Sequence, residues 1–266
     1  MSIILEAKGV SKHFGGLKAV EQVDMQVKEG SIFGIIGPNG AGKTTFFNLC
    51  SGTYKVTSGQ ILFGGQDITN LPPEEVAKKG LIRTFQNIKL FQYLSVLENV
   101  KVGCHINTKT SVLDAIFHTK TYHQDEEYAT RKAEKVLEEV GLTEYRDWKA
   151  GNLPYGYQRK VEIARALAAE PKVLLLDEPA AGMNPAETWS LLEFIQKIRD
   201  KGHTIVVIEH DMKFVMNLCD HIMVLSFGEK ICEGTPDTVK NDRNVQEAYF
   251  GRGIIQKSNE LSQEGA

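Results

Sequence analysis

The run GPNGAGKTT, residues 37–45, constrains this chain more than any other stretch of its 266 residues. It follows SIFGII (31–36), an apolar run typical of a short buried strand, and a helix is expected through Thr45 to about Cys50. The run has the pattern G-x4-G-K-[ST], which binds phosphate when a strand precedes it and a helix follows it. Its glycines let backbone N–H groups approach an anion, and the helix N-terminus favours negative charge. The sequence therefore predicts a site for a nucleoside triphosphate.

Every residue of this loop is a candidate for contact with the nucleotide. Lys43 is expected to reach the β- and γ-phosphates, and the Thr44 hydroxyl is expected to ligate Mg²⁺. The loop residues predicted to bind the nucleotide are Gly37, Pro38, Asn39, Gly40, Ala41, Gly42, Lys43, Thr44 and Thr45. A chance glycine-rich turn is the alternative, and the flanking strand and helix argue against it.

Composition fits an ordinary globular chain. Apolar residues make up 42% and charged residues 24%, which suits one large domain or one domain with an inserted subdomain. The net charge of −3 gives no general attraction to nucleic acid. No apolar run approaches the length of about 18 residues that spans a bilayer, and the start MSIILEAKGV has no signal-peptide core. The four cysteines lack metal-ligand spacing, so we expect reduced thiols in a soluble, cytosolic type of chain.

The first half of the chain changes from strand patterns to helix patterns. Residues 3–33 look β-rich, 60–68 read as a hairpin, and LIRTFQ (81–86) returns as a strand. From about Asn87 to Asn152 the strand patterns vanish. This stretch is predicted to form an inserted helical subdomain.

The second half alternates strand and helix. Buried strands are expected at 173–179 and 204–210, with a helix at 186–200 between them. The segments predicted from these changes are a core part at 1–86, the helical subdomain at 87–152, a second core part at 153–250 and a polar tail at 251–266.

A pair of acids ends the apolar strand VLLLDE (173–178). Asp177 is expected to hold Mg²⁺ through its waters, and Glu178 to activate a water as a general base. Solvated acids at a strand end are common, so this pair says little alone. Its order after the phosphate loop favours the catalytic interpretation.

Two further polar residues follow strands. Gln86 ends the strand pattern 81–86, and His210 ends the strand pattern 204–210. Each has an ordinary alternative, a polar strand end for Gln86 and a surface residue for His210. Because the carboxyl ends of parallel strands share one edge, His210 is expected at the same edge as the phosphates.

The order of these elements is similar to that of the ATP-binding cassette (ABC) ATPase family. A phosphate loop, a Gln before a helical insert, a glycine-containing turn before a helix, an Asp-Glu pair and a His after the next strand follow one another over about residues 3–250. The resemblance implies an α/β fold of P-loop NTPase type. This fold has a parallel-sheet core, an N-terminal antiparallel β subdomain and an inserted helical subdomain. ATP and Mg²⁺ are the implied ligands.

The resemblance also assigns roles to single residues. It implies that Gln86 contacts Mg²⁺ and senses the γ-phosphate, that His210 is the switch histidine, and that Glu178 is the catalytic glutamate. Phe14 in KHFGGLKAV matches the aromatic that stacks on adenine, and a buried core aromatic is the alternative. The implied metal ligands are Thr44, Gln86 and Asp177.

The stretch LPYGYQRKVEIARAL (153–167) falls on the signature motif of this family, which usually reads LSGGQ. We expect a turn at Pro154–Tyr157 and a helix from Val161 onward. In the family this motif faces the γ-phosphate held by a second subunit, which implies that role for the amide of Gly156. Pro154 removes a hydroxyl that would donate to phosphate. Asn184 stands where the family's D-loop usually has Asp.

The signature with its aromatic, the run LDEPAAGMNP, IEHDM and AYFG together resemble the ATPase subunits of branched-chain amino acid importers. The implied partners are integral membrane permease subunits, a second ATPase subunit and, indirectly, a substrate-binding protein. The implied location is the cytoplasmic face of the membrane. An ATPase for urea or amide uptake or for lipid export, a soluble ABC protein and a non-hydrolysing nucleotide sensor remain alternatives.

Overall fold

The computed structural model describes residues 2–107 and 110–250. The chain forms two compact units. Unit 1 contains Met1–Val76 and Thr204–Ala266, and unit 2 contains Ala77–His203. The polar tail predicted at 251–266 lies outside the described residues. Within the described part of the chain, no helix is both long enough and apolar enough to cross a membrane.

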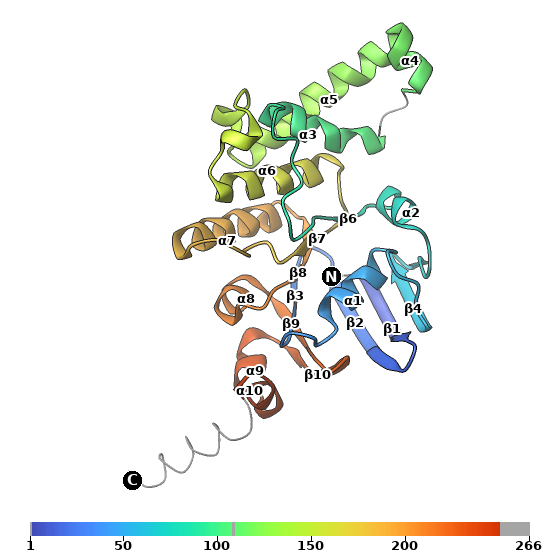
Figure 1. Ribbon diagram of the computed structural model, residues 1–266, viewed down its shortest axis with the longest axis vertical. Helices are drawn as coiled ribbons and strands as arrows, with labels where there is room; N and C mark the ends of the chain where they lie inside the picture. Colours follow the sequence, from blue (N-terminus) through green and yellow to red (C-terminus); the bar gives the residue numbers. More distant parts are fainter. Residues whose placement is uncertain (1, 108–109, 251–266) are drawn as a thin grey trace. The chain divides into compact units, whose positions relative to one another are not determined.

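Unit 1 contains an antiparallel sheet with the strand order β2-β1-β4-β5. Its strands are β1 (Ile3–Phe14), β2 (Leu17–Lys28), β4 (Ser58–Phe63) and β5 (Gln66–Asp67) (Figure 1). Along β2, Val23, Met25 and Val27 are buried and alternate with exposed residues, because successive side chains point to opposite faces. Gly64 and Gly65 make the predicted hairpin turn with positive φ angles of 55° and 76°.

Unit 1 also contains parallel strands. β3 (Ile32–Ile36) pairs in parallel with β8 (Thr204–Ile208) and with β9 (His221–Ser226). β10 (Glu229–Gly234) pairs with β9 in the antiparallel direction. Every residue of β3 and β8 is buried, as expected for strands covered on both faces. The helices of this unit are α1 (Lys43–Cys50), α8 (Met212–Leu218), α9 (Pro236–Asn241) and α10 (Arg243–Phe250).

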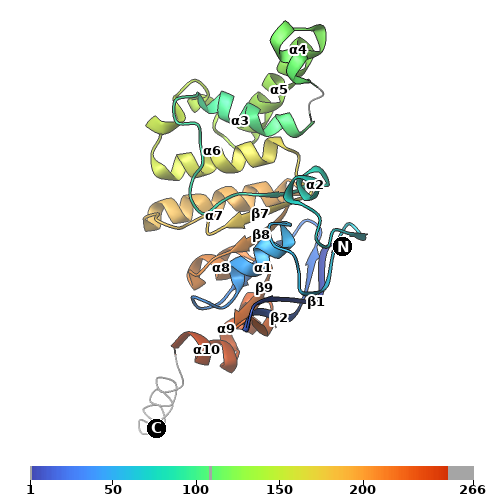
Figure 2. The same cartoon turned by 45° about the vertical axis from the view of Figure 1, so that its right-hand side comes forward.

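Unit 2 contains several helices, and those between residues 96 and 139 fall within the stretch 87–152 predicted to be helical. Its helices are α3 (Val96–Cys104), α4 (Val112–Phe117), α5 (Lys120–Glu139), α6 (Tyr155–Ala168) and α7 (Pro185–Asp200), with 3-10 turns at His105–Asn107, Thr143–Tyr145 and Ala150–Asn152. The short helix α2 (Pro73–Lys78) spans the start of the unit. α3, α5 and α6 pack on one another, as Figures 1 and 2 both show. β6 (Leu81–Arg83) pairs in parallel with β7 (Val173–Asp177).

Three predicted strands are shorter than their sequence patterns. β6 ends at Arg83, and the amide of Thr84 still donates to Leu175 of β7. The carbonyls of Phe85 and Gln86 then accept hydrogen bonds from the Arg159 side chain instead of from a neighbouring strand. β7 ends at Asp177, where the following residue turns into the left-handed region. β8 ends at Ile208, because the chain then turns into α8.

The predicted turn at Pro154–Tyr157 is wrong, because these residues open α6. The amides of Tyr157 and Gln158 both donate to the carbonyl of Pro154 at 3.0 Å, which makes Pro154 the N-cap. The fixed φ of proline fits the start of a helix, and the first N–H groups of a helix need no intrahelical partner. Gly156 has a negative φ like its neighbours. The aromatics and the glycine therefore stand in the first helical turn.

Candidate functional site

The phosphate loop in unit 1 is shaped by glycines in conformations that other residues avoid. Gly37, Gly40 and Gly42 have φ angles of 154°, 80° and 98°. A Cβ atom at Gly37 would lie 2.1 Å from the carbonyl oxygen of Leu225, and one at Gly42 would lie 2.4 Å from that of Ala19. Both sites therefore need glycine for space as well as for backbone conformation.

Lys43 is held over this loop. Its ammonium group donates to the carbonyl oxygen of Gly37 at 2.7 Å and to that of Pro38 at 3.1 Å. The side chain is almost fully buried. The loop backbone thus places one positive charge at its own centre.

The N-terminus of α1 completes this arrangement. Gly42 is the N-cap, it makes no side-chain capping hydrogen bond, and the first turn contains no acid. The amide groups of the first turn and the positive end of the helix dipole therefore have no competing side-chain anion. Thr44 is exposed in this turn, and Thr45 is half-buried. The loop, Lys43 and the helix start together suit a phosphate chain.

His210 lies at the same edge of the parallel strands as the phosphate loop. Ile35 of β3 pairs with Ile208 of β8, and Gly37 and His210 each follow two residues later. The His210 side chain is 56% exposed, and its Nδ1 lies 3.5 Å from the carboxylate of Glu209. The strand register supports the predicted position of the histidine.

Phe14 is 44% exposed at the end of β1, so it is not a core aromatic. Its ring makes an edge contact with Tyr54, with 5.6 Å between the ring centroids. The ammonium of Lys12 lies 4.9 Å from the ring centroid. The part of the ring that these two neighbours leave exposed suits stacking on a base.

Unit 2 carries the two predicted acids at the end of β7. The Asp177 carboxylate is buried and accepts a hydrogen bond from Arg83 Nη2 at 2.6 Å. Glu178 follows with a φ of 44°, in the left-handed region. A non-glycine residue held there costs on the order of 1 kcal/mol or more, and such residues cluster at functional sites.

Gln86 and Glu178, which are 92 residues apart in sequence, meet in unit 2. The Gln86 side-chain amide donates to Glu178 Oε2 at 2.9 Å. Gln86 stands in the irregular segment after β6, and Glu178 stands directly after the neighbouring strand β7. The structure thus brings together two of the residues that the sequence singled out.

The start of α6 is packed against the start of α7. Gly156 is buried, and a Cβ atom at this position would lie 3.4 Å from Glu187 Cγ. Glu187 and Asn184 form a capping box, in which the Asn184 side chain accepts from the Glu187 amide at 3.0 Å. Asn184 is therefore the N-cap of α7, a position where asparagine and aspartate serve about equally well.

Two arginines of the site were not found from the sequence. Arg83 pairs with Asp177, and Arg159 is the largest fully buried side chain of the described residues. Arg159 and Glu162 stand three residues apart on the same face of α6 as the buried residues Ile163 and Ala166. The sequence signal that could have revealed Arg159 is the presence of charged residues on the apolar face of a predicted helix.

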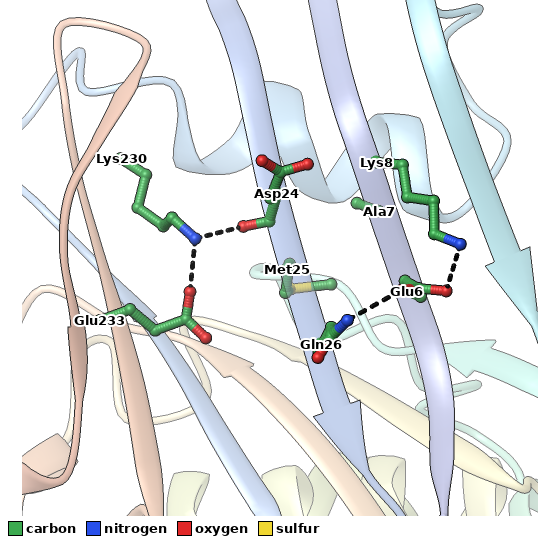
Figure 3. A pocket seen from close by; sticks show the side chains of 8 residues that line it. All are labelled: Glu6, Ala7, Lys8, Asp24, Met25, Gln26, Lys230 and Glu233. Carbon is green, nitrogen blue, oxygen red and sulfur yellow. Dashed lines mark hydrogen bonds and ion pairs between the residues drawn. The ribbon is translucent and has the colours of Figure 1, made fainter.

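A hollow of about 300 Å³ lies elsewhere in unit 1. Figure 3 shows that its charged groups mostly satisfy one another. Lys230 pairs with Glu233 and with the carbonyl of Asp24, and Glu6 pairs with Lys8 and Gln26. Nothing in this hollow suggests a ligand.

Residues 20–181 match the family model described as ABC transporter, and residues 229–254 match one described as branched-chain amino acid ATP-binding cassette transporter. The chain belongs to the ABC transporter family as an ATP-binding ATPase subunit. This confirms the family and the P-loop ABC fold expected from the motifs.

Two curated relatives narrow the comparison. The high-affinity branched-chain amino acid transport ATP-binding protein BraF of Pseudomonas aeruginosa is 45% identical over 249 residues, which are 93% of this chain and 98% of BraF. The corresponding protein LivG of Escherichia coli strain K12 is 42% identical over the same shares.

Solved structures agree with the fold. A nucleotide-free ATP-binding cassette from an ABC transporter is 37% identical with a TM-score of 0.81, over 94% of this chain and all of that one. The ADP conformation of the cassette MJ1267 is 37% identical with a TM-score of 0.82, over 95% of this chain and all of that one.

Proposed function

We propose that this chain is the ATP-hydrolysing motor subunit of an importer for branched-chain amino acids. The names of the relatives that cover 93% of the chain support this substrate class, and so does the family model that matches residues 229–254. They favour it over uptake of urea or amides and over lipid export. The subunit works at the cytoplasmic face of a membrane, with permease subunits and a substrate-binding protein.

The observation that carries the hydrolytic part of the proposal is the hydrogen bond from Gln86 to Glu178. This bond orients the Glu178 carboxylate, whose direction is also set by the left-handed backbone of Glu178. Glu178 accepts the proton of the attacking water as a general base. Gln86 contacts both Glu178 and the γ-phosphate, so the position of Glu178 depends on whether the γ-phosphate is bound. Lys43 and His210 stabilise the negative charge that develops on the transferred phosphoryl group. Phe14 stacks on the adenine.

The residues proposed to hold Mg²⁺ suit a hard cation. Thr44, Gln86 and Asp177 offer hydroxyl, amide and carboxylate oxygens, the donor types that Mg²⁺ prefers. Asp177 is buried and fixed by Arg83, so its carboxylate is oriented in advance. When bound, Mg²⁺ would neutralise charge on the β- and γ-phosphates.

A second ATPase subunit, a copy of this chain or a paralogue, is proposed to meet the start of α6. Pro154 makes no side-chain capping bond and the first turn of α6 contains no acid, so no side chain of this turn competes for its amides or for the positive end of the helix dipole. The amide of Gly156 belongs to this turn. These groups would attract the γ-phosphate bound by the other subunit.

The permease is proposed to contact an aromatic surface of unit 2. Its members are Phe85, Phe91, Tyr93, Leu94 and Trp148, all of which are exposed. The backbone brings these stretches together, because the Ala150 amide donates to the Leu94 carbonyl and the Val96 amide donates to the Trp148 carbonyl. Exposed apolar groups that gather in this way mark interaction sites.

Reconstitution with the membrane subunits that co-purify with the chain tests the proposal. We expect ATP-dependent uptake of labelled leucine into vesicles. Glu178→Gln should keep ATP binding and lower turnover on the order of 100-fold or more, which is the usual contribution of a general base. Lys43→Ala should lose ATP binding. Glu127→Gln, an exposed acid on α5, is the matched control and should change neither.

Two outcomes would contradict parts of this proposal. Full turnover in Glu178→Gln would remove the general-base assignment. Uptake of urea or an amide in place of leucine would overturn the substrate class and leave the ATPase assignment intact.

A further inference from the structure

Arg159 is a charged side chain with no exposure to solvent. Nη1 donates to the carbonyl oxygen of Phe85 at 2.8 Å and to Glu162 Oε2 at 2.7 Å. Nη2 donates to the carbonyl oxygen of Gln86 at 2.6 Å and, at 3.5 Å, to the hydroxyl of Tyr155. All four N–H groups of the two terminal nitrogens therefore have an acceptor.

These acceptors belong to separate parts of the site. Phe85 and Gln86 lie in the segment after β6, and Tyr155 opens α6, the helix of the signature motif. The Tyr155 hydroxyl in turn donates to the carbonyl oxygen of Ala181 at 3.2 Å, in the D-loop before α7. Arg159 thus joins residues 85–86 to α6, and Tyr155, on the same helix, joins α6 to Ala181.

Two more charged residues of α6, Glu162 and Arg165, hold Lys89 in the segment after β6. Glu162, which is 1% exposed, accepts from the amide of Lys89 at 3.3 Å. Arg165 donates to the carbonyl of Lys89 at 2.6 Å. The backbone of residues 85–89 is therefore fastened to α6 at both ends.

The geometry of these contacts requires arginine. The fork of the guanidinium serves two backbone carbonyls and a carboxylate in different directions, whereas a lysine has one nitrogen and three N–H groups. A buried charged pair is also a poor way to gain stability, because desolvation of both ions opposes their attraction. A role in orientation explains the pair better than a role in stability.

We propose that Arg159 is a positioning residue for ATP hydrolysis. By holding the carbonyls of Phe85 and Gln86 against α6, it keeps the Gln86 side chain on Glu178. Its contact with Tyr155, which bonds to Ala181, links the position of residues 85–86 to that of the D-loop. This inference rests on the proposed function, in which Gln86 and Glu178 act on ATP.

Variants of Arg159 separate orientation from folding. Arg159→Lys keeps the charge and loses the fork. The double variant Arg159→Met with Glu162→Leu removes both buried charges and keeps the packing, so the fold is retained. Lys160→Met is the matched control, because this half-buried cation of α6 contacts Ser190, Tyr157 and Phe194 and no residue of the 85–89 segment.

The full chain is first tested for hydrogen exchange, which needs no turnover. We expect faster exchange of the amides in residues 84–91 in Arg159→Lys and in the double variant, with wild-type rates in Lys160→Met. Tyr155→Phe should raise exchange only in residues 180–184. ATP affinity should stay within about twofold of wild type, since the phosphate loop is untouched.

Turnover is then measured with the same variants. A displaced Gln86 should lower kcat on the order of tenfold to a hundredfold, the effect of a misplacement of about 1 Å. The double variant should melt at the wild-type temperature and still turn over slowly. Wild-type exchange or wild-type kcat in the double variant would overturn the proposal. If wild-type protein itself failed to hydrolyse ATP, the proposed function would fall, while the exchange data would still test the contact.

Discussion

The helices α1 and α6 both begin without a side-chain cap, but the chain builds the two N-termini in different ways. Before α1, glycines with positive φ angles make the loop itself concave. Before α6, Pro154 starts an ordinary helix whose Gly156 is buried against Glu187. One helix start is shaped by its own backbone. The other is shaped by the elements that pack around it.

This difference predicts how each region responds to substitutions. The phosphate loop depends on a few backbone conformations, so a single Cβ atom can destroy it. The α6 region depends on side-chain contacts between distant segments, so its failure should appear as lost stability and lost orientation. Substitutions in the two regions separate these modes.

The largest effect on stability is expected for Arg159→Met. It leaves Glu162 as a buried charge without its main partner, which costs about 3–5 kcal/mol of unfolding free energy. Urea denaturation measures this loss. Arg146→Met, which breaks a half-exposed pair with Glu134, is the control and should cost less than about 1 kcal/mol.

The loss in Arg159→Met should depend on pH. Burial raises the pKa of the Glu162 carboxyl, and Arg159 opposes that rise. Without Arg159 the folded pKa rises further above the unfolded pKa. A raised folded pKa contributes stability that is present below the unfolded pKa and is lost as pH rises through the folded pKa. The destabilisation should therefore grow as the pH rises above the unfolded pKa of a glutamate, about 4.3. A loss independent of pH would mean that Glu162 is already neutral.

Gly42→Ala should break the phosphate loop. The new Cβ atom would meet the carbonyl oxygen of Ala19 at 2.4 Å, at a φ of 98°. ATP affinity should fall about 100-fold, which corresponds to roughly 3 kcal/mol. Gly40→Ala is the comparison, because its Cβ atom meets nothing within 4 Å and pays only for backbone strain. Equal losses in a titration with fluorescent ATP would show that space at Gly42 is irrelevant.

Asn184→Ala removes the N-cap of α7 and should cost about 1 kcal/mol. Asn184→Asp keeps the cap, so its unfolding free energy should stay within about 0.5 kcal/mol of wild type. Thermal or urea denaturation compares the two. A large gain in stability from aspartate would mean that the charge, and not the cap, matters at this position.

Pro154→Ser should change stability least. A serine N-cap adds about 1 kcal/mol, and loss of the proline restriction in the unfolded chain removes about 0.4–1 kcal/mol. The net change should lie within about 0.5 kcal/mol. The new hydroxyl should strengthen ATP-dependent dimerisation about tenfold in a Glu178→Gln background, as expected for a hydrogen bond to a charged group. Sedimentation with and without ATP measures this, and an unchanged dimer would argue against the proposed contact.

The difference between the phosphate loop and the start of α6 also explains which features could be predicted from the sequence. The phosphate loop, the strands around it and the acids at the end of β7 follow from local patterns, and so does the change to helices after Asn87. The contacts of Arg159 with Phe85 and Gln86 join residues more than 70 positions apart. No local pattern contains that pairing. The start of α6 was placed too late because Gly156 and two tyrosines resemble a turn, although packing against α7 allows a helix.

The left-handed backbone of Glu178 has a consequence for the evolution of such chains. Glycine or asparagine would adopt this conformation with less strain, so these two inactive variants should fold at least as well as the active protein. Selection for abundance alone would therefore erode the acid. Its retention in a lineage is evidence that turnover itself is under selection.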